Sequence, residues 1–471
     1  MTKNLTLERK LRQLDIWALA FGCIVGWGAF INPGKQFLPD SGTLGTAIAM
    51  IAGALIIAII SFSYAFMIPR YPKAGGEFTF AGIFFGRNAA YICGWFLAAS
   101  YIAIIPLNAT ALGLVIDGLF GSVLKSGFHY NIAGFDIYAG EMFFAMFVLV
   151  LFALLSIRGV GVAGHIQTFL SLTLAICVIV PSLAAVFSSQ TSLNNLSPLW
   201  GFDVKTGVPT GSSVRDILNS VLVTLVIAPW AFVGFDTIPQ AAEELNFPHK
   251  KVRFLMIAAI LFGCFVYIAN NTIAAAVFQN WPEVITSNKY PWLLLSASEK
   301  LLGTAGKIFI GAAVLSAVLT GIMGFYMASS RLIFSMARDG YLPEFLGRIN
   351  EHYRTPGNAI IFCMIISLAG PVLGREALGW FVDMSSVGAS VGFGFTCAAA
   401  LKLSWSEKKF TVSLLSLAGV LFSLMFLFFQ IIPVPGLEGV HLGNESYIML
   451  VIWIVSGILF FRFQSNSTVK N

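Results

Sequence analysis

The sequence predicts an all-α integral membrane protein with about twelve transmembrane helices. Hydrophobic residues make up 57% of its 471 residues and charged residues only 11%, whereas soluble globular chains carry about 25% charged residues. The apolar residues also occur in runs of about 20, the length that a helix needs to cross about 30 Å of hydrocarbon. Because lipid offers the backbone no hydrogen-bond partner, such runs must be helical.

The predicted spans follow one another with short connections, so the whole chain, 1–471, forms one transmembrane domain. The spans are residues 16–37, 45–68, 89–119, 140–157, 164–187, 216–240, 253–278, 305–337, 358–374, 378–402, 410–431 and 447–462. Two of them, 89–119 and 305–337, are longer than a bilayer requires and should tilt or project from it. The amphipathic stretch 281–304 is interpreted as a helical loop outside the membrane.

The distribution of positive charge predicts the orientation. With the N-terminus in the cytoplasm, 20 of the 28 lysines and arginines fall in cytoplasmic segments. The other eight are Lys35, Lys125, Lys205, Arg215, Lys289, Lys300, Lys307 and Arg375. This bias follows the positive-inside rule, so we expect both termini on the cytoplasmic side of an inner or plasma membrane. The net charge of +6 is spread over short loops, and no nucleic-acid partner is expected.

Residue types that carry catalysis or bind metals do not cluster in the sequence. All six cysteines fall inside apolar runs without CxxC spacing, and the five histidines are scattered among loops and ends. The sequence therefore predicts no disulfide, no metal site, no cofactor and no catalytic residues. It also lacks a phosphate-binding loop of the G-x-x-x-x-G-K-[ST] type, which gives no support to a nucleotide-driven pump.

Helix breakers interrupt two of the apolar runs. Span 1 contains GCIVGWGAF (residues 22–30) followed by Pro33, and span 6 contains APWAFVGFDTIPQAAEEL (residues 228–245). Proline removes a helix hydrogen bond and glycine weakens helicity. In a membrane, freed backbone groups are tolerated where they line a cavity or meet a ligand. The alternative is that the glycines only allow close helix packing.

The two interrupted spans lie five spans apart, which is the spacing of two five-helix repeats with inverted topology. We expect the repeats at 16–187 and 216–402, with two further helices in 410–462. Glycine- or proline-interrupted spans at matching positions indicate a transporter site near the bilayer midplane. The freed N–H groups of such a break suit a carboxylate.

Asp236 is an acid inside span 6, three residues after Val233 and six after Trp230, so the three share roughly one helical face. A carboxylate at mid-membrane costs at least about 2.5–3.5 kcal/mol and indicates a function. We expect its protonation to couple to substrate binding or to opening of the inner pathway. The alternative is that Asp236 only bonds backbone groups freed by Gly234 and Pro239.

Other polar groups have more ordinary interpretations. Glu243 and Glu244 sit beside the basic residues of 249–253 and are expected to form interfacial ion pairs. Tyr101 and Asn108 in span 3 are expected to hydrogen-bond between helices.

Several separated motifs resemble those of the amino acid–polyamine–organocation transporters, which share the LeuT-type inverted-repeat fold. Besides the two interrupted spans, YPKAGGEFTF (71–80) is similar to the family's loop after helix 2. ASSRLIFSMARDGYLP (328–343) is similar to its helix 8, and YRTP (353–356) to the segment before helix 9. The resemblance implies a secondary active transporter, or permease, that moves an amino acid or small amine by alternating access. Transport would be coupled to an ion gradient or to exchange.

The resemblance also implies roles for particular residues. Backbone groups in the helix 1 break would hold the carboxylate and amine of the substrate, Trp230 would close over it, and Val233 would contact it. The implied substrate-binding residues are Cys23, Ile24, Gly26, Trp27, Gly28, Trp230, Val233 and Asp236. Ser329, Ser330 and Asp236 are the candidates for ion coupling, because hydroxyl residues of helix 8 hold the ion in sodium-coupled relatives.

Two departures from the family pattern leave questions open. Trp27 stands where a small residue is usual; its ring either narrows the pocket and favours a small ligand, or turns outward. Span 164–187 contains no lysine, which puts a lysine-based proton mechanism in doubt and leaves proton and sodium as alternatives. A transporter-like sensor and an integral membrane enzyme are the competing functions. The sequence does not determine the substrate, the choice between symport and antiport, or the oligomeric state.

Overall fold

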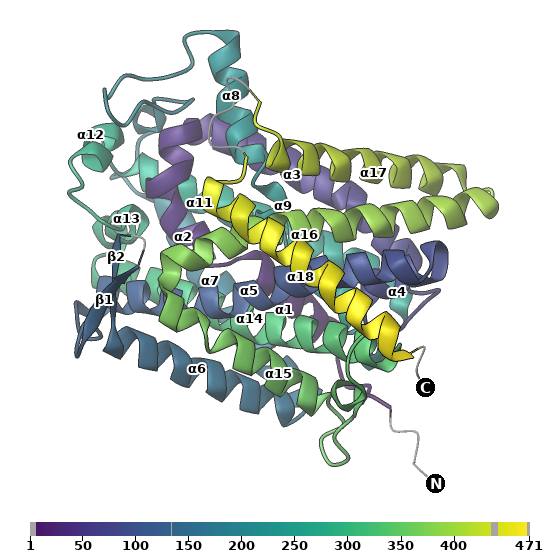
Figure 1. Cartoon of the computed structure of the whole chain (residues 1–471). Helices are drawn as coiled ribbons and strands as arrows, with labels where there is room; N and C mark the ends of the chain where they lie inside the picture. Colours follow the sequence, from purple (N-terminus) through teal and green to yellow (C-terminus); the bar gives the residue numbers. More distant parts are fainter. Residues whose placement is uncertain (1–5, 133, 435–440, 469–471) are drawn as a thin grey trace.

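The computed structural model describes residues 6–132, 134–434 and 441–468, and it is a bundle of helices (Figure 1). In the described part the one sheet is a hairpin of β1 (His129–Ile132) and β2 (Phe135–Tyr138). Within these ranges, ten helical segments are long and apolar enough to cross a membrane. The prediction of an all-α membrane protein with about twelve transmembrane helices is confirmed.

The helices follow the order of the predicted spans. The bounds are α1 Gln13–Ile24, α2 Gly28–Asn32, α3 Leu38–Met67, α4 Gly76–Phe85, α5 Arg87–Phe120, α6 Ala139–Ile157, α7 Val160–Phe187, α8 Val214–Leu225, α9 Ala228–Ala231, α10 Thr237–Gln240, α11 Val252–Ala276, α12 Trp281–Thr286, α13 Leu293–Leu302, α14 Thr304–Arg338, α15 Gly357–Ser367, α16 Gly370–Ser406, α17 Phe410–Ile431 and α18 Asn444–Thr468. The amphipathic stretch after α11 forms the short helices α12 and α13, as expected. The long spans α5 and α14 have 34 and 35 residues.

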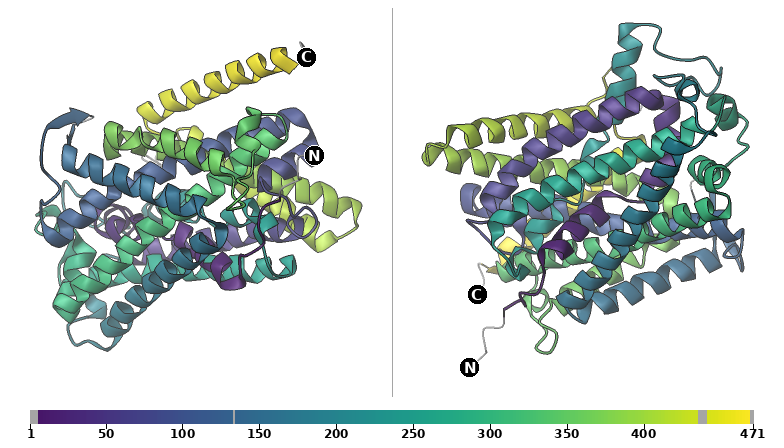
Figure 2. Two further views of the ribbon diagram at one scale, coloured as in Figure 1. Left: turned by 90° about the horizontal axis from the view of Figure 1, so that it is seen from below. Right: turned by 180° about the vertical axis from the view of Figure 1, so that it is seen from behind.

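The bundle has two ends. Both termini lie at one end, with α4 and the end of α14, and we call this the termini face (Figure 1). The β-hairpin, α12 and α13 lie at the other end, the hairpin face. Helix α18 lies along the outside of the bundle (Figure 2), where Trp95 Nε1 of α5 donates to the Trp453 carbonyl at 3.0 Å.

The connection between the first two spans, at 38–44, contains a residue with a non-helical backbone conformation, Gly42. A π-helical turn, Pro33–Phe37, leads into α3. The helix bends at Gly42, where φ is +64° and a Cβ would lie 2.5 Å from the Leu199 carbonyl. The loop before α8 packs at this bend, where Thr43 Oγ1 donates to the Leu196 carbonyl at 2.7 Å. This distant loop packs against the bend that separates the first two spans.

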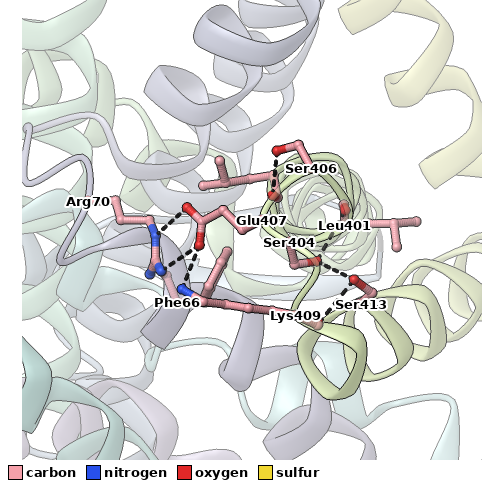
Figure 3. Close-up of polar contacts among 9 residues, drawn as sticks. Phe66, Arg70, Leu401, Ser404, Ser406, Glu407, Lys409 and Ser413 are labelled. Atoms are coloured by element: carbon pink, nitrogen blue, oxygen red, sulfur yellow. Dashed lines mark hydrogen bonds and ion pairs between the residues drawn. The ribbon is translucent and has the colours of Figure 1, made fainter.

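On the termini face, a cluster of charges joins the end of α3 to the turn between α16 and α17 (Figure 3). Arg70 Nη2 lies 3.0 Å from Glu407 Oε2, and Lys409 Nζ lies 2.6 Å from the same oxygen. Ser404 and Ser413 share a hydrogen bond of 2.9 Å across the turn. The cluster is exposed to solvent, so it positions the turn without forming part of the core.

Candidate functional site

The first span is interrupted between Ile24, where α1 ends, and Gly28, where α2 begins. Among the described residues, the backbone N–H groups of Trp27 and Gly28 have no acceptor. A Cβ built on Gly26 would meet no atom within 4 Å. The break therefore presents free backbone donors, and an open space beside Gly26, to the centre of the bundle.

The sixth span is interrupted between Ala231, where α9 ends, and Thr237, where α10 begins. Gly234 has a φ of +139°, a conformation that only glycine adopts at little cost. A Cβ at Gly234 would lie 2.6 Å from the Ile24 nitrogen. The two breaks therefore touch directly, and the contact requires glycine.

Tyr267 of α11 also joins the two breaks. Its hydroxyl lies 3.3 Å from the Ile24 carbonyl and 3.2 Å from the Ala231 carbonyl, and its side chain is buried. These are the carbonyls that end α1 and α9. The sequence analysis did not single out Tyr267, because a tyrosine in an apolar run gives no signal about the partner it meets.

A small cavity lies between the two breaks, with a volume of about 30 Å³. A water molecule needs about 10–15 Å³ of such space, so the cavity is contracted. Its lining comprises Cys23, Ile24, Gly26, Trp27, Ile104, Leu107, Asn108, Trp230, Val233, Tyr267, Gly321 and Phe325. Six of the predicted substrate-binding residues are in this lining, whereas Gly28 and Asp236 are not. Asn108, which we expected to bond between helices, lines the cavity and donates to the Ile104 carbonyl of its own helix.

Aromatic rings close the cavity toward the hairpin face. The rings of Trp27 and Trp230 meet edge to face, with centroids 6.4 Å apart, and the Arg375 guanidinium lies 4.1 Å over the Trp27 ring. A Cβ at Gly28 would lie 2.6 Å from the Trp230 ring, so glycine there lets Trp230 pack over the break. Beyond the rings, a vestibule of about 340 Å³ is lined by Arg375 and Asp383 among others. Trp27 thus takes part in the closure.

Ion pairs close the bundle toward the termini face. Glu244 and Arg331 form a two-pronged pair with N–O distances of 2.8 and 3.0 Å, and their side chains are 0% and 1% exposed. Glu243 pairs with Arg338 at 2.8 Å and accepts the Ala74 N–H at 2.9 Å. Both acids form ion pairs as expected, with partners on α14 in place of the basic run that follows them.

Asp236 lies beside the sixth-span break and is completely buried. Its Oδ1 accepts the Gly234 N–H at 2.7 Å, and its Oδ2 accepts the Tyr101 hydroxyl at 2.9 Å. Tyr101 therefore bonds between spans, as expected. The bond to Gly234 agrees with the alternative that Asp236 only hydrogen-bonds freed backbone groups. The bond to Tyr101 does more, because the Tyr101 hydroxyl also lies within hydrogen-bond distance of a second buried acid, Glu77.

The two helix 8 serines are bonded within their own helix. Ser329 Oγ donates to the Phe325 carbonyl at 2.6 Å. Ser330 Oγ donates to the Met327 carbonyl at 3.1 Å and accepts from Arg331 Nη1 at 3.0 Å. Within the described ranges, no group of three or more histidines, cysteines and acids is arranged to hold a metal.

Two broken spans that meet at a small cavity, with a separate barrier on each side, define a secondary transporter. The chain belongs to the amino acid permease family, whose model matches residues 11–458. It is 23% identical to a methylthioribose transporter of Bacillus subtilis, over 100% of this chain and 96% of the relative. It is 24% identical to a branched-chain amino acid permease of Bacillus subtilis, over 82% and 79% of the two chains.

A mammalian relative matches over a similar length. The large neutral amino acids transporter small subunit 2 of Mus musculus is 26% identical, over 96% of this chain and 82% of the relative. These relatives are named as transporters or permeases, so the family is one of transporters and not of enzymes.

Proposed function

We propose that the protein carries a small neutral amino acid across the cytoplasmic membrane by alternating access. The observation that carries this proposal is the cavity shared by the two breaks, which is closed by rings on one side and by ion pairs on the other. The free N–H groups of Trp27 and Gly28 would bind the substrate carboxylate. The carbonyls beside Tyr267 would accept hydrogen bonds from its amine.

The lining of the cavity supports a neutral substrate. Among the described lining residues there is no lysine, arginine, aspartate or glutamate, and a cationic side chain would enter without a counter-charge. The rings of Trp27, Trp230 and Phe325 border the space, which favours a small side chain. Relatives named for branched-chain and large neutral amino acids agree with a neutral substrate.

The orientation and the repeats complete the proposal. With the N-terminus inside, 20 of the 28 lysines and arginines fall in cytoplasmic segments, which supports a termini face on the cytoplasmic side. The breaks at matching positions in spans 1 and 6 support inverted repeats at 16–187 and 216–402. All six native cysteines are buried. Single cysteines introduced as Ser122→Cys and Glu351→Cys can therefore show on which side of the membrane each position lies. An impermeant maleimide should label intact cells at position 122 and not at 351; the reverse pattern would overturn the orientation.

Binding and uptake measured together test the function. A panel of amino acids and amines in a thermal-shift assay should show stabilisation by neutral amino acids, about 2.7 kcal/mol at 100 times the Kd. Proteoliposomes should then accumulate the same compounds. Gly26→Val, which places a side chain in the open space of the break, should abolish both signals in a folded protein.

A ligand sensor is the alternative function. It would show the stabilisation without any flux, in both counterflow and net uptake. Stabilisation by cationic amines alone would contradict the proposed substrate class.

A further inference from the structure

Two completely buried carboxylates, Glu77 and Asp236, lie on either side of one tyrosine. The Tyr101 hydroxyl is 2.9 Å from Asp236 Oδ2 and 3.4 Å from Glu77 Oε1. Glu77 is the first acid of α4, in the motif after helix 2, and comes from a different part of the chain from the broken span. The sequence analysis assigned it no role.

Among the residues that the structure describes, the pair has no basic partner. Neither acid takes part in any ion pair of the described residues, and each is 0% exposed. The titratable groups that face the pair are Tyr64 of α3, Cys93 and Tyr101 of α5 and Cys23 of α1. All of these are neutral or acidic, so two charged carboxylates would be uncompensated. Like charges in one buried site ionise one at a time, which leaves the pair sharing a proton.

Each acid accepts hydrogen bonds on both of its oxygens, so a shared carboxyl proton needs an acceptor that one of these partners can supply. Asp236 accepts from the Gly234 N–H on Oδ1 and from the Tyr101 hydroxyl on Oδ2, the environment of an ionised carboxylate. Glu77 accepts from Tyr64 and from the Gln240 amide. In the described residues Gln240 Oε1 has no partner. Turning this amide over would present Oε1 to Glu77 Oε2 as an acceptor for a carboxyl proton.

We propose that Glu77 is a proton-binding site that couples transport to a proton gradient, with Tyr101 passing the proton between Glu77 and Asp236. In the transfer, rotation of the Glu77 carboxyl group first brings its proton from the Gln240 side to the oxygen that faces Tyr101. Glu77 then gives this proton to the Tyr101 oxygen while Tyr101 gives its own hydroxyl proton to Asp236. Glu77 becomes the carboxylate and Asp236 the acid, and no other bond changes. This proposal rests on the proposed transport function and names its coupling ion.

A chain of contacts connects this site to the closure on the termini face. Glu77 follows the loop whose Ala74 N–H donates to Glu243, the partner of Arg338. Ser335 of α14 donates to the Ala74 carbonyl at 2.8 Å. Glu77 also holds Gln240 at the end of α10, four residues before Glu244. A change of charge at Glu77 thus acts on both acids of the termini-face closure.

The test uses the full-length protein in proteoliposomes that contain a pH-sensitive dye. For the unmodified protein, uptake of the substrate should move protons inward with it, and an imposed proton gradient should drive accumulation. Glu77→Gln, which keeps the volume and removes the titratable proton, should lose proton movement and gradient-driven accumulation. It should keep substrate counterflow, which needs no net proton. Tyr101→Phe should slow proton movement without abolishing counterflow.

The outcomes separate this proposal from the proposed function. Loss of both counterflow and binding in Glu77→Gln, with the fold intact, would assign Glu77 to structure or substrate and overturn the proton site. Undiminished proton-driven accumulation would overturn it as well. Failure of the unmodified protein to exchange substrate would instead reject transport.

A matched control and a spectroscopic readout complete the design. Glu141→Gln removes a half-buried acid of α6, next to Gly113 near the hairpin face, and should leave proton movement unchanged. Infrared difference spectra on shifting the pH should contain a protonated-carboxyl band in the unmodified protein that Glu77→Gln lacks. Persistence of that band in Glu77→Gln would place the proton elsewhere.

Discussion

The two closures of the central cavity use different chemistry. Toward the hairpin face the barrier consists of the rings of Trp27 and Trp230 with Arg375 above them, and a vestibule of about 340 Å³ already reaches the rings. Toward the termini face it is the buried ion pair of Glu244 and Arg331, flanked by Glu243 and Arg338. The barrier toward the hairpin face consists of aromatic and cation–π contacts. The barrier toward the termini face is an ion pair between the segment after α10 and α14.

This difference has a mechanical consequence. Aromatic and cation–π contacts are each worth about 0.5–2 kcal/mol, and rings move aside by rotation about side-chain bonds. Separating a buried ion pair leaves two uncompensated charges unless water enters. We therefore expect the hairpin side to open readily, and opening toward the termini to be slower and to require the change of charge supplied at Glu77.

The largest effect is expected at the buried ion pair. Arg331→Met leaves Glu244 buried without a partner and should lower the free energy of unfolding by about 3–5 kcal/mol. Adding Glu244→Leu to the same protein should recover most of this stability, because neither charge then remains. Thermal unfolding in detergent measures both variants. A double variant as unstable as the single one would show that the pair does not act as a unit.

The next effect concerns Trp230. Trp230→Leu removes the ring that covers the break, so uptake should be lost while the unfolding temperature changes little. Trp405→Leu is the matched control, since Trp405 is exposed at the termini face and its replacement should preserve uptake. Normal uptake by Trp230→Leu would place the hairpin-side closure elsewhere.

A smaller change is expected at Arg375. Arg375→Ala removes a cation–π contact worth about 0.5–2 kcal/mol, which should favour the hairpin-open state by about two- to thirtyfold. Substrate binding from the vestibule should become faster, as followed by stopped-flow tryptophan fluorescence. Arg375→Lys should be intermediate, because lysine keeps the charge without the planar group. An unchanged binding rate in Arg375→Ala would show that the contact does not restrain the rings.

The smallest effect is expected at the exposed cluster of Glu407. Hydrogen bonds from Lys409 and Arg70 lower the pKa of this carboxyl below its ordinary value of 4.5. Its contribution to stability is therefore present above pH 4.5 and is lost as the pH falls through the lower folded value. Glu407→Gln should slightly flatten the acid side of the stability profile, measured by thermal unfolding. A large loss of stability at neutral pH would contradict a peripheral role.

The two breaks were predictable from the sequence because their signal is local. Glycines 22, 26 and 28 and the Pro229, Gly234 and Pro239 series weaken a helix wherever it lies, and an apolar run with such residues has few stable alternatives in lipid. The packing at the Gly42 bend was not predictable, because it depends on a loop more than 150 residues away.

The roles of several site residues could not be predicted from the sequence for a related reason. Glu77 stands in a loop motif, where an acid could equally well be exposed to solvent. Tyr267 stands in an apolar run, where an aromatic ring could equally well face lipid. Their roles come from Tyr101, Gln240 and the ends of α1 and α9, which are distant in the chain. Asp236 was identified as an acid inside an apolar span and from the family resemblance, while its bond to Tyr101 required the structure.

The sequence by itself determined the class of the protein, the order of its spans and the places where two of them break. Each of these follows from the transfer of apolar groups and backbone into lipid, which depends on nearby residues only. The tertiary structure decided which groups line the cavity, how each side is closed and that two buried acids share one tyrosine. These features depend on distances between separate helices, which packing of the whole bundle sets and no local pattern encodes.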